Sequence, residues 1–248
     1  MAIAFSEKFI GVLERAENVV ILTGAGVSAE SGVPTFRGQD GLWKKFRPEE
    51  LATFEAFEKN PELVWEWYRY RRNIISEIKP NDGHFAMAEM EHLFDMFHLL
   101  TQNVDGLHEK AGSKNMIELH GNIRRNKCLN CRQIDFRDDF DKYPPLCQCG
   151  GKLRPDVVWF GELLPEAALR TAFEVSQDCD LFFVAGTSAA VYPAASLPAL
   201  ARKHGAFVIE INIEPTDLTY IVDEHIEGKS GEIFPEIVKK LKKLKGII

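Results

Sequence analysis

Short apolar runs rich in β-branched residues alternate along this chain with segments whose apolar residues recur at helical spacing. A short apolar run that ends in a glycine or polar turn is typical of a strand buried in a parallel sheet. We therefore expect strands within residues 19–26, 96–105, 116–121, 153–162, 179–188 and 206–214. Helices are expected within residues 4–17, 83–94, 165–177, 194–205 and 232–245. The alternation predicts an α/β fold in which helices cover a mainly parallel sheet.

Residues 36–79 interrupt this alternation, because they offer no strand. Glycines and a proline break the first half of the segment. The second half has a strong helical pattern that begins at Pro61, and proline is a favoured first residue of a helix. The segment therefore reads as a helical insertion into the α/β fold.

The composition limits the class of function. Hydrophobic residues make up 45% of the chain, which is enough for a sizeable core, and the net charge of −7 disfavours coating of nucleic acid by bulk attraction. A membrane-spanning helix needs about 18 apolar residues in a row, and no run in this sequence is that long. Charges interrupt the apolar residues near the N-terminus, so a signal peptide is not expected. We expect a monomeric cytoplasmic protein without membrane or nucleic-acid partners.

Four of the five cysteines form two pairs, Cys128 with Cys131 and Cys147 with Cys149, fifteen residues apart. Four thiolates favour tetrahedral Zn²⁺, and the lack of an open position indicates a structural metal. The second cysteine pair encloses one residue, whereas each pair of a usual zinc ribbon encloses two. The alternatives to a zinc site are four reduced thiols or a redox-active pair. The region lacks apolar residues for its own core, so removal of zinc should unfold it. Cys179 is expected to be a buried thiol.

A glycine turn ends the first expected strand. The sequence Gly24-Ala25-Gly26-Val27-Ser28-Ala29 fits the pattern G-x-G-x-x-G/A, which places a pyrophosphate against a helix N-terminus. Alone, the pattern is equally compatible with an ordinary strand–helix turn. A dehydrogenase would also need an acidic residue after a second strand about 20 positions later. Glu49 and Glu50 stand in an apparently helical segment instead, which argues against ordinary hydride transfer.

Several specific motifs occur in order along nearly the whole chain: GAGVSAESGVPTFRG (24–38), TQNVDGLH (101–108), ELHG (118–121), VVWFGE (157–162), AGTS (185–188) and INIE (211–214). With the four cysteines, they closely resemble the sirtuins, which are NAD-dependent protein-lysine deacylases. The resemblance implies a single catalytic domain, residues 1–248. It has a large Rossmann-type parallel-sheet part (about 1–35, 80–122 and 152–248) and a smaller module that joins the helical insertion (about 36–79) to a zinc ribbon (about 123–151). NAD and the acyl-lysine meet between the two parts.

The resemblance also implies the chemistry. In the family, the acyl oxygen of a modified lysine attacks C1′ of the nicotinamide ribose, nicotinamide leaves, and an alkylamidate forms. A ribose hydroxyl then attacks the alkylamidate, which yields free lysine and 2′-O-acyl-ADP-ribose. The resemblance implies that His120 is the catalytic histidine of the family, and a neutral imidazole near pH 7 suits the role of the base. Asn103 is the other catalytic residue implied. The six remaining histidines are expected to be structural.

Most residues that the resemblance assigns to NAD follow expected strands. The resemblance implies that Gln102, Asn103 and Asp105 belong to the nicotinamide and ribose pocket. Amide side chains suit this pocket, because the carboxamide of nicotinamide has both a donor and an acceptor. On its own this segment could be an Asx-type turn. The full set is Gly24, Ala25, Gly26, Ser28, Phe36, Arg37, Gln102, Asn103, Asp105, Gly186, Thr187, Ser188, Asn212, Glu214 and Ser230.

Two further segments match those between which a substrate peptide lies as an added strand. Because backbone pairing reads little sequence, the resemblance implies broad tolerance of acylated proteins and peptides. The residues are Val158, Trp159, Phe160, Gly161, Glu162, Val191 and Tyr192.

The helical insertion bears on the acyl group. Tyr68 and Arg71 are three residues apart and so share a helical face. A Tyr-x-x-Arg pair resembles the class III subgroup, which removes succinyl, malonyl and glutaryl groups, and Ala52 matches its small pocket residue. Thr35 stands where most deacetylases have aspartate. Arginine and tyrosine can read a carboxylate by charge-assisted hydrogen bonds, whereas an exposed arginine stacked on tyrosine is the alternative. We expect removal of both acetyl and succinyl groups.

Two other functions remain as alternatives. A protein ADP-ribosyltransferase would use the same fold with a different acceptor. A zinc-ribbon adaptor would bind NAD or protein without turnover, and the presence of His120 beside an intact QNVD segment argues against it.

Overall fold

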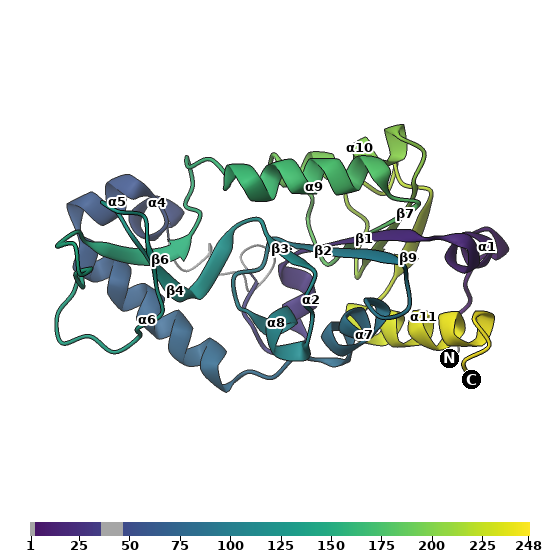
Figure 1. Ribbon diagram of the computed structural model, residues 1–248, viewed down its shortest axis with the longest axis horizontal. Helices are drawn as coiled ribbons and strands as arrows, with labels where there is room; N and C mark the ends of the chain where they lie inside the picture. The colour runs from purple at the N-terminus through teal and green to yellow at the C-terminus, as the bar shows by residue number, and fades with distance from the viewer. Residues whose placement is uncertain (1–2, 36–46) are drawn as a thin grey trace.

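The computed structural model describes residues 3–35 and 47–248. The molecule is elongated, with a large helix-covered sheet at one end and a small module at the other (Figure 1). The large sheet is parallel throughout and has the strand order β3-β2-β1-β7-β8-β9. Its strands are β1 (Asn18–Thr23), β2 (Met96–Thr101), β3 (Met116–Glu118), β7 (Leu181–Ala185), β8 (Phe207–Asn212) and β9 (Glu224–Glu227).

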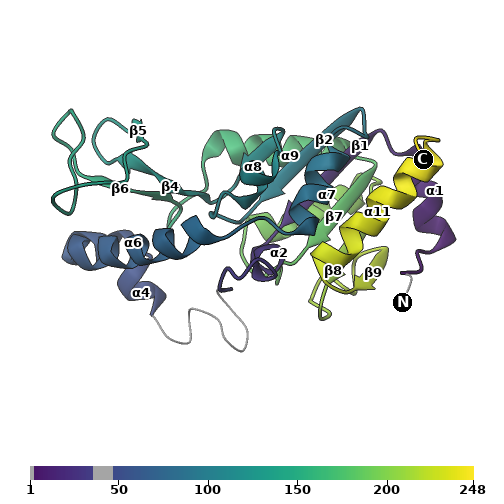
Figure 2. The same ribbon diagram turned by 90° about the horizontal axis from the view of Figure 1, so that it is seen from below.

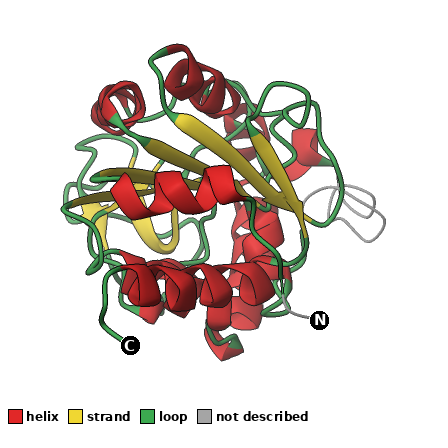
Figure 3. Cartoon of the chain, turned by 90° about the vertical axis from the view of Figure 1, so that its right-hand side faces the viewer, coloured by secondary structure: helices red, strands yellow, loops and turns green. Residues whose placement is uncertain are grey.

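Helices cover both faces of this sheet, as Figure 3 shows from the end that carries α1. Successive side chains of a strand point to opposite faces, so Phe183 packs with α1, α7 and α11 while Phe182 packs with α9 and α10. The expected Rossmann-type α/β architecture is confirmed. The helices are α1 (Glu7–Arg15), α7 (Asp82–Met90), α9 (Glu166–Asp178), α10 (Leu197–Lys203) and α11 (Ser230–Leu244), with the short helices α2 (Ala25–Ala29), α8 (Leu107–Ala111) and η1 (Ala194–Ser196). Within the described residues, we find no helix with the length and apolar character needed to cross a bilayer.

The small module has its own core, between a helical layer and an antiparallel sheet (Figure 2). Pro61 begins its longest helix, as the sequence predicts, and the Asn60 side chain caps that helix by accepting from Leu63 N. Trp65, Tyr68 and Trp159 are almost completely buried in this core. The elements are α4 (Pro48–Leu51), α5 (Phe54–Lys59), α6 (Pro61–Glu77), β4 (Gly121–Cys128), β5 (Ile134–Asp135) and β6 (Leu153–Val157).

The strand expected within residues 153–162 differs in length and in place. Strand β6 ends at Val157 and pairs with β4 in the small sheet, not with the large parallel one. A boundary near residue 152 therefore runs just before a strand of the small sheet, and the domain boundaries stay a prediction. Strand β9 was not expected, because its sequence EHIE lacks the apolar run of a central strand and it pairs on one side only, with β8.

The zinc ribbon is held together around the four cysteines. Their Sγ atoms all lie within 4.8 Å of one another, with 3.5 Å between Cys128 and Cys149 and 3.7 Å between Cys131 and Cys147. Zn–S bonds of about 2.3 Å in a tetrahedron place sulfur atoms about 3.8 Å apart. The four cysteines are thus positioned to bind one structural zinc ion. Cys179 is buried away from this cluster, as expected.

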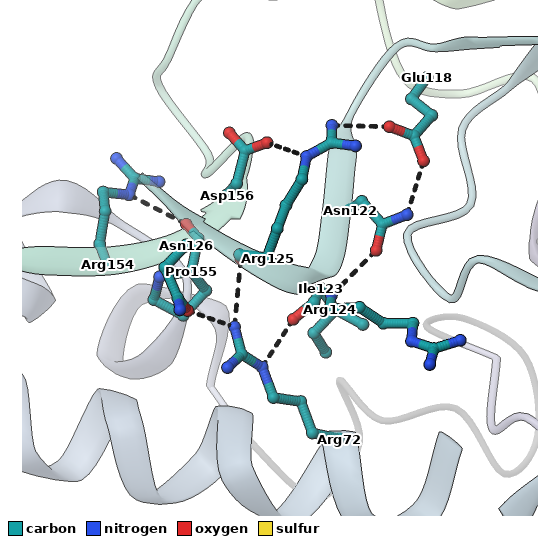
Figure 4. Close-up of polar contacts among 10 residues, drawn as sticks. All are labelled: Arg72, Glu118, Asn122, Ile123, Arg124, Arg125, Asn126, Arg154, Pro155 and Asp156. Carbon is teal, nitrogen blue, oxygen red and sulfur yellow. Dashed lines mark hydrogen bonds and ion pairs between the residues drawn. The ribbon is translucent and has the colours of Figure 1, made fainter. Parts of the chain in front are cut away.

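A network of ion pairs and hydrogen bonds joins the end of β3 in the large sheet to β4 and β6 in the small one (Figure 4). The Arg125 guanidinium on β4 lies 2.6 Å from Glu118 Oε2 at the end of β3 and 2.6 Å from Asp156 Oδ2 on β6. Asn122 Nδ2 donates to the other Glu118 oxygen, and Arg72 on α6 donates to the backbone carbonyl of Arg125. One arginine therefore links the edge of the large sheet to the small module.

Arg125→Met should lower the free energy of unfolding by about 2 kcal/mol more than Arg124→Met. The substitution leaves the carboxylates of Glu118 and Asp156, each about 15% exposed, without their cation. Arg124 is the exposed neighbour on the same strand and serves as the control. Urea unfolding at neutral pH measures both variants, and equal losses of stability would contradict the role given to Arg125.

Cys131→Ser should reduce the zinc content of the purified protein from one equivalent to well below one and lower the melting temperature. The metal holds residues that have little apolar core of their own. Cys179→Ser removes a thiol outside the cluster and should keep a full equivalent of zinc. Metal analysis checks both variants, and full zinc retention in Cys131→Ser would refute the four-thiolate site.

Candidate active site

A cavity of about 620 Å³ lies where the large sheet meets the small module. On the sheet side, its lining comes from the carboxyl ends of β1, β2, β3, β7 and β8. The strand order reverses between β1 and β7, which lie side by side although most of the chain up to α9 separates them. Open parallel sheets bind ligands at such a switch point. On the other side, the lining comes from the helical insertion and from the segment after β6.

Two glycine turns form part of this lining and pack backbone against backbone. Gly26 N donates to Gly186 O at 2.7 Å. A Cβ on Gly24 would lie 2.6 Å from Thr187 Cβ, and a Cβ on Gly186 would lie 2.5 Å from Val27 N. Gly186 also has a φ of +56°, which favours glycine. The contact leaves a surface of backbone groups that a phosphate can approach closely.

The amide side chains after β2 are oriented by the protein. Asn103 Nδ2 donates to Gly24 O at 3.0 Å and lies 3.2 Å from Ser28 Oγ. No donor to its Oδ1 is found within the described residues, so this oxygen can accept from a ligand. Gln102 Nε2 donates to Thr187 Oγ1 at 3.0 Å. These contacts join the loop after β2 to both glycine turns, and the segment is therefore more than an isolated turn.

His120 lines the cavity between β3 and β4. Its Nδ1 lies 3.1 Å from the carbonyl oxygen of Gln102, which can only accept, so Nδ1 carries the proton. The neutral Nε2 has no hydrogen-bond partner in the part of the chain that the structure describes and can accept a proton. Burial lowers the pKa of His120, while the bond to the carbonyl partly opposes this effect. Gly121 has a φ of +77°, and a Cβ there would lie 2.1 Å from Asp156 O. Glycine is therefore required next to this histidine.

His84 and His108 do not line the cavity. Their rings lie 4.7 Å apart behind it, and His108 Nε2 lies 3.0 Å from Thr23 Oγ1. Burial lowers the pKa of His84 to about 4 and that of His108 well below its ordinary value. Both rings are therefore neutral near pH 7, in agreement with structural roles.

The expected acyl-binding residues converge on the small-module side. Ala52, Tyr68 and Arg71 are all buried and all line the cavity. Tyr68 Oη accepts from Trp159 Nε1 at 2.9 Å. Arg71 is only 6% exposed, and its guanidinium lies 4.9 Å from the centre of the Trp67 ring. The alternative of an exposed arginine is therefore wrong, although the guanidinium also lies 6.0 Å from the centre of the Tyr68 ring.

The segment after β6 has already used several of its backbone donors. Val158 N donates to His120 O, Trp159 N to Glu162 Oε2 and Phe160 N to Ala52 O, at 2.8 to 3.0 Å. A peptide strand at this segment would therefore pair with its remaining backbone groups. The expected peptide-binding residues all line the cavity: Val158, Trp159, Phe160, Gly161, Glu162, Val191 and Tyr192.

The expected NAD residues fall into three groups. One group lines the cavity: Gly24, Ala25, Gly26, Gln102, Asn103, Gly186, Thr187, Ser188, Asn212 and Glu214. Ser28, Asp105 and Ser230 are buried but are not part of the lining. Burial raises the pKa of Asp105, and the positive charge of Arg71 is among the factors that oppose this rise. Phe36 and Arg37 lie outside the described residues. The roles of all these residues stay predictions.

Sequence reasoning missed part of the lining. Trp67 lies next to Tyr68, and Ile213, Pro215, Thr216 and Asp217 continue the loop after β8. The position of the loop after β8 could have indicated these residues, because loops that follow parallel strands near a switch point face the ligand. The buried carboxylate of Glu210 holds this loop by accepting hydrogen bonds from Thr216 and Thr219. The other lining residues that carried no expected role are Thr35, Val104, Val157 and Leu164.

Comparison with known proteins agrees with this geometry. A sequence model of the Sir2 family matches residues 24–193. The chain is 55% identical over 217 residues to an NAD-dependent protein deacylase of Aquifex aeolicus, which covers 86% of this chain and 91% of that protein.

Two solved structures are similar over nearly the whole chain. A Sir2 homologue in complex with NAD shares 48% identity at a TM-score of 0.89, over 98% of this chain and 96% of that one. A mutant Sir2 homologue in complex with 2′-O-acetyl ADP ribose shares 48% identity at a TM-score of 0.89, over 96% and 97% of the two chains. The expected family is thereby confirmed, and the chain belongs to the Sir2 family.

Proposed function

We propose that this protein is an NAD-dependent protein-lysine deacylase. One observation carries the proposal: a single cavity is lined by two close-packed glycine turns, by His120 with a free Nε2, and by a buried Tyr68–Arg71 pair. The first feature suits a dinucleotide, the second a base, and the third an acyl group. The relative from Aquifex aeolicus, named as an NAD-dependent protein deacylase, supports the same activity.

NAD lies across the switch point in this proposal. Its pyrophosphate rests on the glycine turns after β1 and β7, where backbone groups approach closely. The nicotinamide end meets Asn103, whose Oδ1 is oriented to accept from a carboxamide. The adenosine ribose meets Asn212 and Glu214 after β8, and the complex of a homologue with NAD supports binding of this dinucleotide.

The acyl-lysine enters from the small-module side, and its acyl oxygen forms the bond to C1′ of the nicotinamide ribose. His120 Nε2 then accepts a proton from a ribose hydroxyl, which attacks the acyl carbon, while Gln102 O holds the protonated Nδ1 in place. Nicotinamide leaves as its bond to C1′ breaks, and lysine leaves the acyl carbon as the free amine. A water molecule then adds to the acyl carbon, and the bond from that carbon to the oxygen on C1′ breaks, which gives 2′-O-acyl-ADP-ribose. A homologue that binds 2′-O-acetyl ADP ribose supports the last product.

Succinyl and malonyl groups are substrates in addition to acetyl, as in the class III subgroup. Ala52 leaves room for a longer acyl chain, and Arg71 presents a buried cation at the cavity. Burial lowers the pKa of Arg71, and the guanidinium nevertheless stays charged at neutral pH. A buried cation with few competing waters is a strong partner for a carboxylate.

Release of nicotinamide tests the proposed function. The purified protein should release nicotinamide from NAD only when an acetyl-lysine or succinyl-lysine peptide is also present. Stable transfer of an adenine label from NAD to protein, without deacylation, would favour the ADP-ribosyltransferase alternative. No turnover with either peptide would favour the adaptor alternative.

His120→Ala should reduce kcat for deacylation by about 100-fold or more, because a positioned base contributes about that factor. The unsubstituted protein should lose kcat as the pH falls through the pKa of His120. Burial lowers this pKa below the ordinary 6.5, so the acidic limb should lie below pH 6.5. His204→Ala, at an exposed site on the surface, is the control. Unchanged rates in His120→Ala would refute the assignment of the base.

Arg71→Met should reduce desuccinylation at least about tenfold more than deacetylation, because only the succinyl group presents a carboxylate to the lost guanidinium. Steady-state rates on matched acetyl- and succinyl-lysine peptides measure the difference. Arg69→Met on the exposed side of α6 provides the control. Equal losses on both peptides would mean that Arg71 does not read the carboxylate.

A further inference from the structure

The hydroxyl group of Tyr68 has a defined hydrogen-bond polarity. The indole Nε1–H of Trp159 can only donate, so at 2.9 Å the Tyr68 oxygen must be the acceptor. The proton of the hydroxyl therefore points elsewhere. No acceptor for that proton is found among the described residues, although the side chain is only 1% exposed and lines the cavity.

The guanidinium of Arg71, which lies beside Tyr68, adds further hydrogen-bond donors and a positive charge at this end of the cavity. Arg71 is on the same face of α6, one turn away, and has only donors. The positive charges of Arg71 and Arg154 act on the Tyr68 hydroxyl, and the negative charge of Glu162, which is paired with Arg154, opposes them. A group that presents only acceptors, such as a carboxylate, can accept the proton of the Tyr68 hydroxyl and is attracted by the charge of Arg71, whereas a methyl group can do neither.

The indole ring of Trp159 is itself held in place from several sides. Trp159 N donates to Glu162 Oε2 at 2.8 Å, and the Arg154 guanidinium, paired with the same carboxylate, lies over the ring. The Phe57 ring packs 5.3 Å away between centroids. The direction of the Nε1–H is therefore set by the protein, independently of any ligand.

We propose that Trp159 is a positioning residue that sets acyl selectivity, because its indole N–H forces the Tyr68 hydroxyl to donate into the cavity. The inference rests on the proposed function, in which this cavity holds the acyl group, and it adds a determinant beyond the Tyr68–Arg71 pair. A hydroxyl that accepts one hydrogen bond also becomes a stronger donor in the next. The ligand class selected is an acyl-lysine with a terminal carboxylate.

The test compares affinities, so that it does not depend on turnover. Calorimetry without NAD gives the Kd of matched acetyl-lysine and succinyl-lysine peptides, and selectivity is the ratio of the two constants. Trp159→Phe should reduce the preference for the succinyl peptide about fivefold, since it removes the N–H and keeps most of the ring. Replacement of Trp159 by 3-benzothienylalanine keeps the full ring size and gives the same comparison if the phenylalanine variant does not fold. Trp65→Phe removes an indole N–H that donates to Leu153 O elsewhere in the module, and it should leave the ratio unchanged.

The role through Tyr68 is tested by a double-mutant cycle with Tyr68→Phe. If Trp159 acts by orienting the Tyr68 hydroxyl, the double variant should have the selectivity of Tyr68→Phe alone. Losses that multiply, or a Trp159→Phe variant that weakens both peptides equally, would overturn the proposal. A wild-type protein without preference for the succinyl peptide would overturn it as well. Intact selectivity without release of nicotinamide would instead refute the proposed function and leave this inference standing.

Discussion

Only Leu119 and His120 separate the last strand residue of β3 in the large sheet from the first of β4 in the small one. This short connection forces the chain to cross from one sheet to the other beside the switch point. Gly121 makes the turn possible through its positive φ, and Arg125 fixes the two sheets on either side of it. The position of the cavity follows, because the histidine at the crossing has the glycine turns on one side and the acyl-binding residues on the other.

The large sheet could be predicted from the sequence because its central strands are largely buried on both faces and contain apolar runs, such as VVIL in β1 and LFFVA in β7. Strand β9 escaped prediction since it is half-exposed and lies at the edge of the sheet. Strand β6 was expected but assigned to the wrong sheet. Its partner β4, with the sequence GNIRRNKC, has no apolar pattern, and long-range pairing between them depends on the ribbon and the helices packed against it.

Site residues that belong to a sequence motif could be predicted, but their burial and their hydrogen-bond partners could not. The sequence indicates Tyr68 and Arg71 on one face of a helix, but the burial of Arg71 follows from packing against Trp67 and the rest of the small module. The hydrogen bond from Trp159 to Tyr68 joins positions 91 residues apart, and no local pattern announces such a pair. Thr216 and Asp217 line the cavity because the buried carboxylate of Glu210 on β8 accepts a hydrogen bond from Thr216, which could not be predicted from the local sequence either.

The central claim is that this cavity brings the acyl oxygen of a modified lysine onto C1′ of the nicotinamide ribose. The most direct measurement uses an acetyl-lysine peptide with a heavy oxygen isotope in its acyl carbonyl, followed by mass spectrometry of the products. If the acyl oxygen forms the new bond to C1′, the isotope should appear in the ADP-ribose half of the product. Isotope that stays in the acetyl group would contradict the account, because the amide would then have been cleaved without that bond.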